Sequence, residues 1–178
     1  MGVLRSPEEN NEALFGDWHL TEKQISIVDG LLLGDATCVS TTKRSSIISL
    51  QLVMGEVVKY YRDLLAPPRI NQISYTPENA HIIMGRVCQC KPLWHWSTGA
   101  YPSLHHQRER WYKNSKKIVP QDVRINRLSV LAWYLGDGTL SHGRSGKASI
   151  CPIFMTNGFT EEDVFFLVTK LVTVQVVK

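Results

Sequence analysis

A short run of residues that occurs twice constrains this chain most. The run LGDAT at positions 33–37 returns as LGDGT at positions 135–139. Each copy follows an apolar stretch whose hydrophobic residues recur at helical spacing. A duplicated run in matched context indicates two related halves, each of which ends a helix with one carboxylate, Asp35 in the first half and Asp137 in the second.

The two aspartates have an ordinary explanation and a functional one. A single Gly-Asp pair after a helix is common, because an Asp side chain can bond the backbone N–H groups of a turn. The duplication favours the functional explanation. One carboxylate from each half is a suitable arrangement for sharing metal ions and phosphates between the halves.

Composition narrows the class of protein. The chain has 178 residues, 43% of them hydrophobic, which suits one domain of ordinary size or two small ones. It contains no run of 18 apolar residues, and its first 11 residues lack a basic region followed by an apolar one. We therefore expect a soluble, intracellular protein with reduced cysteines, located in the cytoplasm or nucleoid or in an organelle (mitochondrion or chloroplast).

The net charge of +4 is unevenly distributed. Residues 86–127 hold nine basic and two acidic side chains, interleaved with Trp94, Trp96, Trp111 and Tyr112. A basic region that carries aromatic residues fits a polyanion surface better than an acidic or small apolar ligand. The alternative is a solvated basic face above buried tryptophans.

The predicted elements follow one order twice. Thr21 and Gln24 form a capping box for a helix over 22–34, and Asn126 is a suitable N-cap for its counterpart, which runs into Asp137. A hairpin follows each helix, and each hairpin is followed by another helix, the second capped by Thr160. The first half adds a second extended pair and a polar helix. The predicted ranges are strands 36–41 and 48–52 around a turn at 42–45, helix 56–65, strands 70–75 and 81–96, helix 104–114, linker 115–125, strands 139–141 and 149–156 around a turn at 142–147, and a helix over 160–171.

With both runs and the linker in view, the chain resembles the single-chain LAGLIDADG homing endonucleases. The matching stretches are 28–36 and 130–138, and the segment 113–120 resembles the family's linker, which carries a basic residue close to the active site. The resemblance covers about residues 21–171. In the first stretch it departs from the name motif at Leu33 and Ala36. The second stretch has Trp133 and Tyr134 where small or aliphatic residues are usual, and Ala132 where the first has Gly30.

The resemblance implies an α+β class: a pseudo-symmetric, duplicated αββαββα fold whose curved antiparallel sheets lie along the major groove of DNA. The first repeat spans 21–114, the linker 115–125 and the second repeat 126–178. Only 41 residues follow Asp137, whereas 102 positions separate the two aspartates. We therefore expect an incomplete second repeat, with a motif helix, one hairpin and one helix.

The resemblance also implies site residues. Small residues let the motif helices pack closely, at Gly30, Gly34, Ala132 and Gly136. Asp35 and Asp137, together with the next residues, Ala36 and Gly138, would form the binding site for Mg²⁺ or Mn²⁺. Lys117, with Lys116 next, would orient the attacking water or neutralise the phosphate. Alternatively, both are ordinary linker lysines that contact phosphates non-specifically.

Polar strand residues are the candidates for reading bases, because Arg and Lys suit guanine edges and Gln suits adenine. The candidates for contacting nucleic acid are Ser40, Thr42, Lys43, Arg44, Ser46, Ser49 and Gln51 in the first hairpin, Arg86, Gln89 and Lys91 in the second, and Lys116 in the linker.

Two cysteines, Cys88 and Cys90, followed by His95, His105 and His106, raise the question of zinc. Strand alternation would place both cysteines on one face. Paired zinc ligands usually have two residues between them, so we expect two small apolar residues that face the core, and no zinc.

The predicted function is that of a monomeric homing endonuclease that makes a double-strand break with short 3′ overhangs at a long, asymmetric DNA target in intron or intein homing. The alternative is an intron RNA maturase or a non-cleaving DNA-binding protein of the same fold, which would use the basic region without the carboxylates. A metabolic α/β enzyme is disfavoured, because the sequence has neither a Gly-rich phosphate loop nor a Ser/Cys-His nucleophile motif. No membrane partner is expected.

Overall fold

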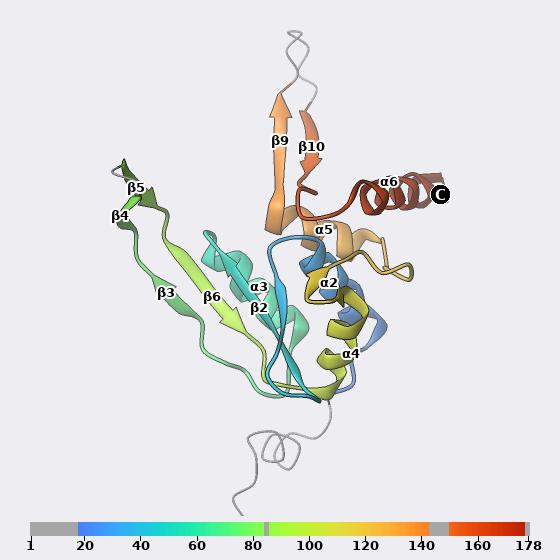
Figure 1. Ribbon diagram of the computed structural model, residues 1–178, viewed down its shortest axis with the longest axis horizontal. Coiled ribbons are helices and arrows are strands. Elements are labelled where there is room, and N and C mark those ends of the chain that lie inside the picture. The colour runs from blue at the N-terminus through green and yellow to red at the C-terminus, as the bar shows by residue number, and fades with distance from the viewer. Residues whose placement is uncertain (1–17, 84–85, 143–149, 177–178) are drawn as a thin grey trace, which may run out of the picture.

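The computed structural model describes residues 18–83, 86–142 and 150–176. The first half contains two layers, helices on one side and strands on the other (Figure 1). Its elements are α2 (Glu22–Leu33), β1 (Thr37–Ser40), β2 (Ser46–Leu52), α3 (Gly55–Leu65), β3 (Ser74–Thr76), β4 (Asn79–Ile83), β5 (Arg86–Cys90), β6 (Leu93–Ser97) and α4 (Pro102–Trp111). A small hairpin, β7 (Tyr112–Lys113) and β8 (Lys116–Lys117), then leads to α5 (Arg127–Asp137), β9 (Gly138–His142), β10 (Ile150–Phe154) and α6 (Glu161–Val176).

The predicted N-caps of the two motif helices are confirmed. Thr21 caps α2 by accepting the N–H of Gln24, whose side chain in turn accepts the N–H of Thr21. Asn126 caps α5 by accepting the N–H groups of Leu128 and Ser129. None of the helices in the described residues is long and apolar enough to cross a membrane.

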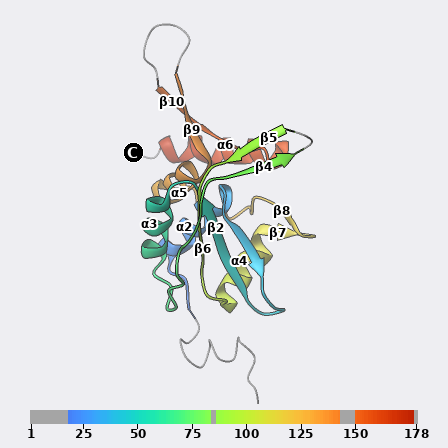
Figure 2. The ribbon, with the colours of Figure 1, turned by 90° about the vertical axis from the view of Figure 1, so that its left-hand side faces the viewer.

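The first-half sheet is antiparallel, with strand order β1-β2-β6-β3. The second extended pair differs from the prediction: its strands begin at Ser74, not at residue 70, and each arm breaks in two, so that β3 pairs with β6 and β4 pairs with β5. The helix expected over 104–114 spans Pro102–Trp111, because the chain turns there into the β7–β8 hairpin. Hairpins β4–β5 and β9–β10 project from the same end of the molecule (Figure 2).

Alternation along the strands builds the core. On β2, Ile48 and Leu50 are buried between the sheet and the helices, whereas Gln51 is exposed on the other face. Trp96 on β6 pairs with Leu50 and is also fully buried. The predicted α+β class with antiparallel sheets is confirmed. Within the described residues, one face of the first-half sheet is free of helices.

Helices α2 and α5 pack against each other at the centre of the molecule (Figure 1). A Cβ atom added to Gly30 would lie 2.7 Å from the Cβ of Ala132, and closer still to the carbonyl oxygen of Ser129. Near the helix ends the fit is less tight, since a Cβ added to Gly34 would lie 3.4 Å from the nearest atom, the carbonyl oxygen of Trp133. The absence of a side chain at Gly30 therefore sets the closest approach of the two helices.

We expect Gly30→Ala to lower the free energy of unfolding by about 1–3 kcal/mol, because the added methyl group forces the helices apart. Urea unfolding followed by circular dichroism measures this loss. Gly34→Ala is the matched control, since its methyl group would make only ordinary van der Waals contact. Equal losses in the two variants would contradict tight packing at Gly30.

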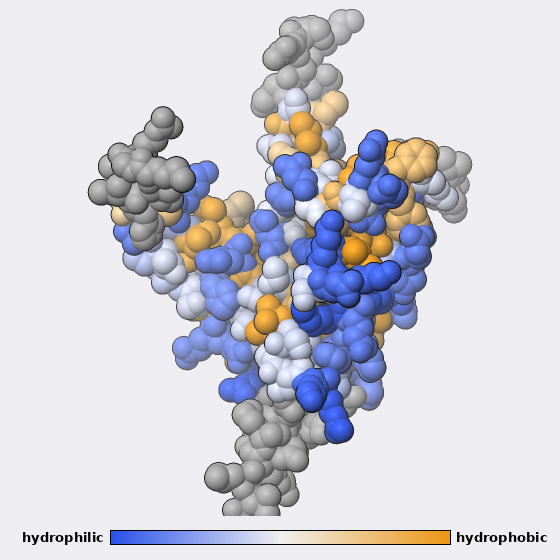
Figure 3. All heavy atoms as spheres, viewed as in Figure 1, coloured by the Kyte–Doolittle hydropathy of each residue, from blue (hydrophilic) through white to orange (hydrophobic). Residues whose placement is uncertain are grey.

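The two halves are covered unequally in the described residues. Cys38 pairs with Ile48 in the first hairpin, and both are buried beneath α4, whose Leu104 carbonyl accepts the Cys38 thiol. The corresponding pair in the second hairpin is Leu140 and Pro152, and Leu140 is 51% exposed. Hydrophobic residues reach the surface over β9–β10 and α6 (Figure 3). Residues of β9 and β10, together with residues of α5, form a hollow of about 630 Å³. It is lined by Arg127, Val130, Leu131, Tyr134, Leu140, Pro152 and Phe154. Residues 143–149, which include most of the predicted turn and the first residue of the predicted strand 149–156, lie outside the described part.

Candidate active site

Asp35 and Asp137 lie next to each other where α2 and α5 end. A Cβ added to Gly136 would lie 3.4 Å from the backbone nitrogen of Asp35, and one added to Gly34 would lie 3.7 Å from that of Asp137. The aspartates leave their helices differently: α2 ends at Leu33, so Asp35 is in the following turn, whereas Asp137 is the last residue of α5. The packing of small residues thus brings together two acids that are 102 positions apart in the chain.

The electrostatic surroundings raise the pKa of both carboxyl groups. For Asp35 the main cause is burial, and the nearby charge of Asp137 adds to it, while Lys117 acts in the opposite direction. For Asp137 burial is again the main cause, opposed by Lys117. A raised pKa means that ionisation of these groups disfavours the folded state, so their contribution to stability is lost as the pH rises through the raised values. A bound cation would remove this cost.

Lys117 lies at the same site, and its ammonium group donates hydrogen bonds to three backbone carbonyl groups. Its Nζ donates to the oxygens of Leu32 at 2.9 Å, Gly34 at 3.3 Å and Ala36 at 2.9 Å. Burial lowers the pKa of Lys117, and the charges of Asp35 and Asp137 oppose that effect. The ammonium and the two carboxylates therefore belong to one electrostatic cluster.

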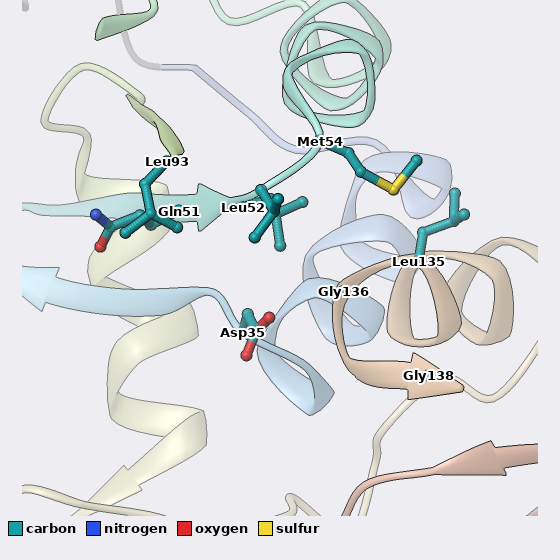
Figure 4. A pocket seen from close by; sticks show the side chains of 9 residues that line it. Asp35, Gln51, Leu52, Met54, Leu93, Leu135, Gly136 and Gly138 are labelled. Carbon is teal, nitrogen blue, oxygen red and sulfur yellow. The ribbon is translucent and has the colours of Figure 1, made fainter. Parts of the chain in front are cut away.

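A hollow of about 290 Å³ opens beside Asp35 (Figure 4). Its walls come from the end of β2, the turn before α3, and the ends of α5 and β6. Apolar side chains line much of it, with Gln51 and Asp35 as the polar members; the lining residues are Asp35, Gln51, Leu52, Val53, Met54, Leu93, Leu135, Gly136 and Gly138. The carboxylate of Asp35 thus borders a partly apolar hollow, which accords with the raised pKa of Asp35.

Asp29, inside α2, was not among the predicted site residues. It is fully buried and accepts two bonds from the guanidinium of Arg110, at 2.7 and 3.1 Å, and one from the indole N–H of Trp111 at 3.0 Å. A fourth donor is the backbone N–H of Arg124, at 2.9 Å. Asp29 therefore ties α2 both to α4 and to the far end of the linker that carries Lys117. The sequence signal that could have indicated this role is an acidic residue inside an apolar helical run. Such a residue is expected to be buried, and a buried charge needs hydrogen-bond partners.

The residues predicted to contact nucleic acid do not share one environment. Ser49 and Gln51 lie on the helix-free face of the sheet, and Gln89, Lys91 and Lys116 are also exposed. Ser40 is the last residue of β1, and the exposed loop after it holds Thr42, Lys43 and Arg44. The Ser40 hydroxyl donates to the carbonyl oxygen of Thr42, and the Thr42 hydroxyl accepts the N–H of Arg44. Ser46 is fully buried and hydrogen-bonds Nδ1 of His105, so the prediction that it faces the groove is wrong. The side chain of Arg86 lies outside the described part.

His95 on β6 was considered only as a zinc ligand, yet it lies in the middle of the helix-free sheet face. Its Nε2 is 3.0 Å from the hydroxyl of Ser49, and its Nδ1 is 3.4 Å from that of Ser74. The signal was the alternation of β6, where Trp94 and Trp96 share one face and His95 takes the other. Ser49, His95 and Ser74 thus form a polar row across three strands.

The expected core position of the cysteine pair is wrong for Cys90, which is exposed. The side chain of Cys88 lies outside the described part. Over the described residues, no three His, Cys, Asp or Glu side chains gather as a metal-binding group.

Comparison with solved structures places the fold in a known class. The chain is similar to the homing endonuclease I-WcaI, solved bound to its DNA recognition sequence, with a TM-score of 0.67 at 19% identity, over 86% of this chain and 68% of that one. The shared architecture is that of a homing endonuclease, with two central helices and antiparallel sheets.

The LAGLIDADG DNA endonuclease family model matches residues 25–175. The chain therefore belongs to that family, as the resemblance predicted. It is 30% identical to an uncharacterised protein of Methanocaldococcus jannaschii, over 86% of this chain and 57% of that protein. It is 26% identical to the cytochrome b mRNA maturase bI2 of Debaryomyces hansenii, over 85% of this chain and 56% of the maturase. The chain thus spans little more than half the length of these two relatives.

Proposed function

We propose that this protein is a metal-dependent, site-specific endonuclease that cuts double-stranded DNA in intron or intein homing and leaves short 3′ overhangs. The meeting of Asp35 and Asp137 at the ends of two closely packed helices carries the proposal. Family membership supports it, since the family is described as DNA endonucleases. We expect a monomer that acts on a long, asymmetric target in the compartment of its host element, whether cytoplasm, nucleoid or organelle.

The donor set fits Mg²⁺ or Mn²⁺. Both ions prefer oxygen ligands, and Mg²⁺ is commonly bound through one or two carboxylates together with substrate phosphates. Asp35 and Asp137 are close enough for one charge to raise the pKa of the other group, and a divalent cation would relieve that repulsion. When bound, the metal would activate water and stabilise the leaving oxygen at a scissile phosphate.

The protein itself holds the two carboxylates in position. The helix packing holds one carboxylate at each half, which suits one cut on each DNA strand. Since the pKa of both carboxyl groups is raised, protonation competes with metal binding at a higher pH than for ordinary aspartates. The helix-free sheet face would contact base edges through residues such as Gln51 and His95.

The test is a cleavage assay on a plasmid that carries the host sequence with the mobile element removed and its flanks joined. We expect one cut in each strand in the presence of Mg²⁺ or Mn²⁺, and none after EDTA, because the paired carboxylates need a metal to hydrolyse a phosphodiester. A plasmid with the joined flanks scrambled is the control. Tight, site-specific binding without cleavage under all metal conditions would contradict the nuclease and indicate a DNA-binding protein of this fold.

The similarity to an mRNA maturase favours a second candidate, in which the chain assists splicing of its host intron RNA. That function would need the basic surface but not the paired carboxylates. Splicing of the host intron in vitro, with wild-type protein and with Asp35→Asn/Asp137→Asn, separates the two. Splicing that persists in the double variant while cleavage is lost would assign both functions to one chain by different residues.

A further inference from the structure

The turn that carries Asp35 follows α2, and it accepts hydrogen bonds from a lysine that lies outside α2. In the last turn of α2 there is no basic residue, although a cation is favoured at the negative end of the helix dipole. The cation comes instead from the linker, since Lys117 donates to carbonyl groups on both sides of Asp35, those of Gly34 and Ala36. Its third acceptor, the oxygen of Leu32, lies within the helix.

The three bonds use the full donor capacity of the lysine. An ammonium group has three N–H donors and no acceptor, and each of the three acceptor oxygens is a backbone carbonyl. To take up a proton from water or to hold a phosphate, Lys117 would first have to release at least one of these bonds. Hydrogen bonds that involve a charged group are stronger than bonds between neutral groups, so in this geometry the ammonium stabilises the turn.

Lys117 is itself held in place by the small β7–β8 hairpin. Asn114 and Ser115 both have positive φ, 50° and 62°, as a two-residue turn between such strands requires. Across this hairpin, Lys117 is the strand partner of Tyr112. The Tyr112 hydroxyl accepts a hydrogen bond from the backbone N–H of Cys38 on β1. The lysine therefore reaches the end of α2 from a strand fixed beside β1.

In the part of the chain that the structure describes, no lysine donates hydrogen bonds to the carbonyl groups around Asp137. It is still helical, and Gly138 caps α5 by donating its backbone N–H to the carbonyl of Tyr134. No basic residue lies in the last turn of α5. The two carboxylates thus have different supports, one built from the helix itself and one that depends on Lys117.

We propose that Lys117 is a positioning residue, whose ammonium clamps the turn from Leu32 to Ala36 and thereby sets the position of the Asp35 carboxylate. This positioning role replaces the predicted role, in which Lys117 orients the attacking water or neutralises the phosphate. In its consequence for DNA cleavage, the inference rests on the proposed function.

The first test is amide hydrogen exchange in metal-free protein, which needs no activity. We expect Lys117→Met to speed exchange about tenfold or more at the amides of Gly34 and Ala36, which are bonded to Gly30 and Leu31, because a charged hydrogen-bond network is lost. Exchange at Gly138 should not change. Lys113→Met, an exposed lysine of the same hairpin, should leave all three rates unchanged. If Lys117→Met does not fold, Lys117→Gln takes its place.

The second test is the pH profile of DNA cleavage. A positioning role predicts that Lys117→Met lowers kcat and keeps the shape of the wild-type profile. Unchanged exchange at Gly34 and Ala36 would overturn the proposal. A profile that loses an ionisation from its acidic limb, where a general base titrates, would overturn it in favour of a proton-transfer role. If wild-type protein cuts no DNA, the proposed nuclease fails, while the exchange rates still decide whether Lys117 clamps the turn.

Discussion

Replacing Asp35 or Asp137 with asparagine should lower the rate of DNA cleavage at least about 10³-fold, because in the proposed mechanism these carboxylates would hold the metal that supplies several kcal/mol of transition-state stabilisation. Asparagine keeps the size of each side chain but removes the charge that attracts a divalent cation. Affinity for DNA should stay the same or increase, since one negative charge near the phosphates is lost. Single-turnover cleavage of target DNA, with binding measured separately by fluorescence anisotropy, checks both expectations.

The matched control is Asp63→Asn on α3, an exposed aspartate whose partner is its neighbour Arg62. That variant should cut at the wild-type rate. Since each half contributes one acid, either single variant should already be severely impaired. Cleavage that survives in Asp35→Asn or in Asp137→Asn would remove that residue from the metal site, and with it the proposed mechanism.

Replacing Asp29 with alanine should lower the free energy of unfolding by about 3–5 kcal/mol, the cost of leaving a buried charge without its partner. The substitution leaves the Arg110 guanidinium, the Trp111 indole N–H and the Arg124 backbone N–H without their shared acceptor. Chemical denaturation at constant m value measures the loss.

Asp122→Ala is the control for this prediction, because Asp122 binds the same Arg110 but its side chain is 67% exposed. An exposed ion pair is worth at most about 1 kcal/mol, so this variant should be nearly as stable as wild type. Equal losses for Asp29→Ala and Asp122→Ala would show that burial of the ion pair does not matter.

Much of the fold followed from local patterns. The caps at Thr21 and Asn126 and the alternation of β2 involve residues within a few positions of each other, so they are visible in the sequence. The long hairpin of the first half was less predictable, because its division into β3–β6 and β4–β5 pairs depends on how the arms bend. The prediction for Ser46 was also wrong. The alternation of β2 places Ser46 with Ile48 and Leu50 on the core face, whereas its polar side chain had suggested the helix-free face.

The site divides in the same way. By itself, the sequence determined that two carboxylates end two related helices, because duplication and helical spacing are properties of the chain alone. Only the tertiary structure decided that Lys117 bonds the carbonyls around Asp35 and that Asp29 is buried beneath Arg110 and Trp111. Those contacts join residues more than 80 positions apart. The positions of the partners follow from the packing of α2 against α4, α5 and the linker, which no local pattern encodes.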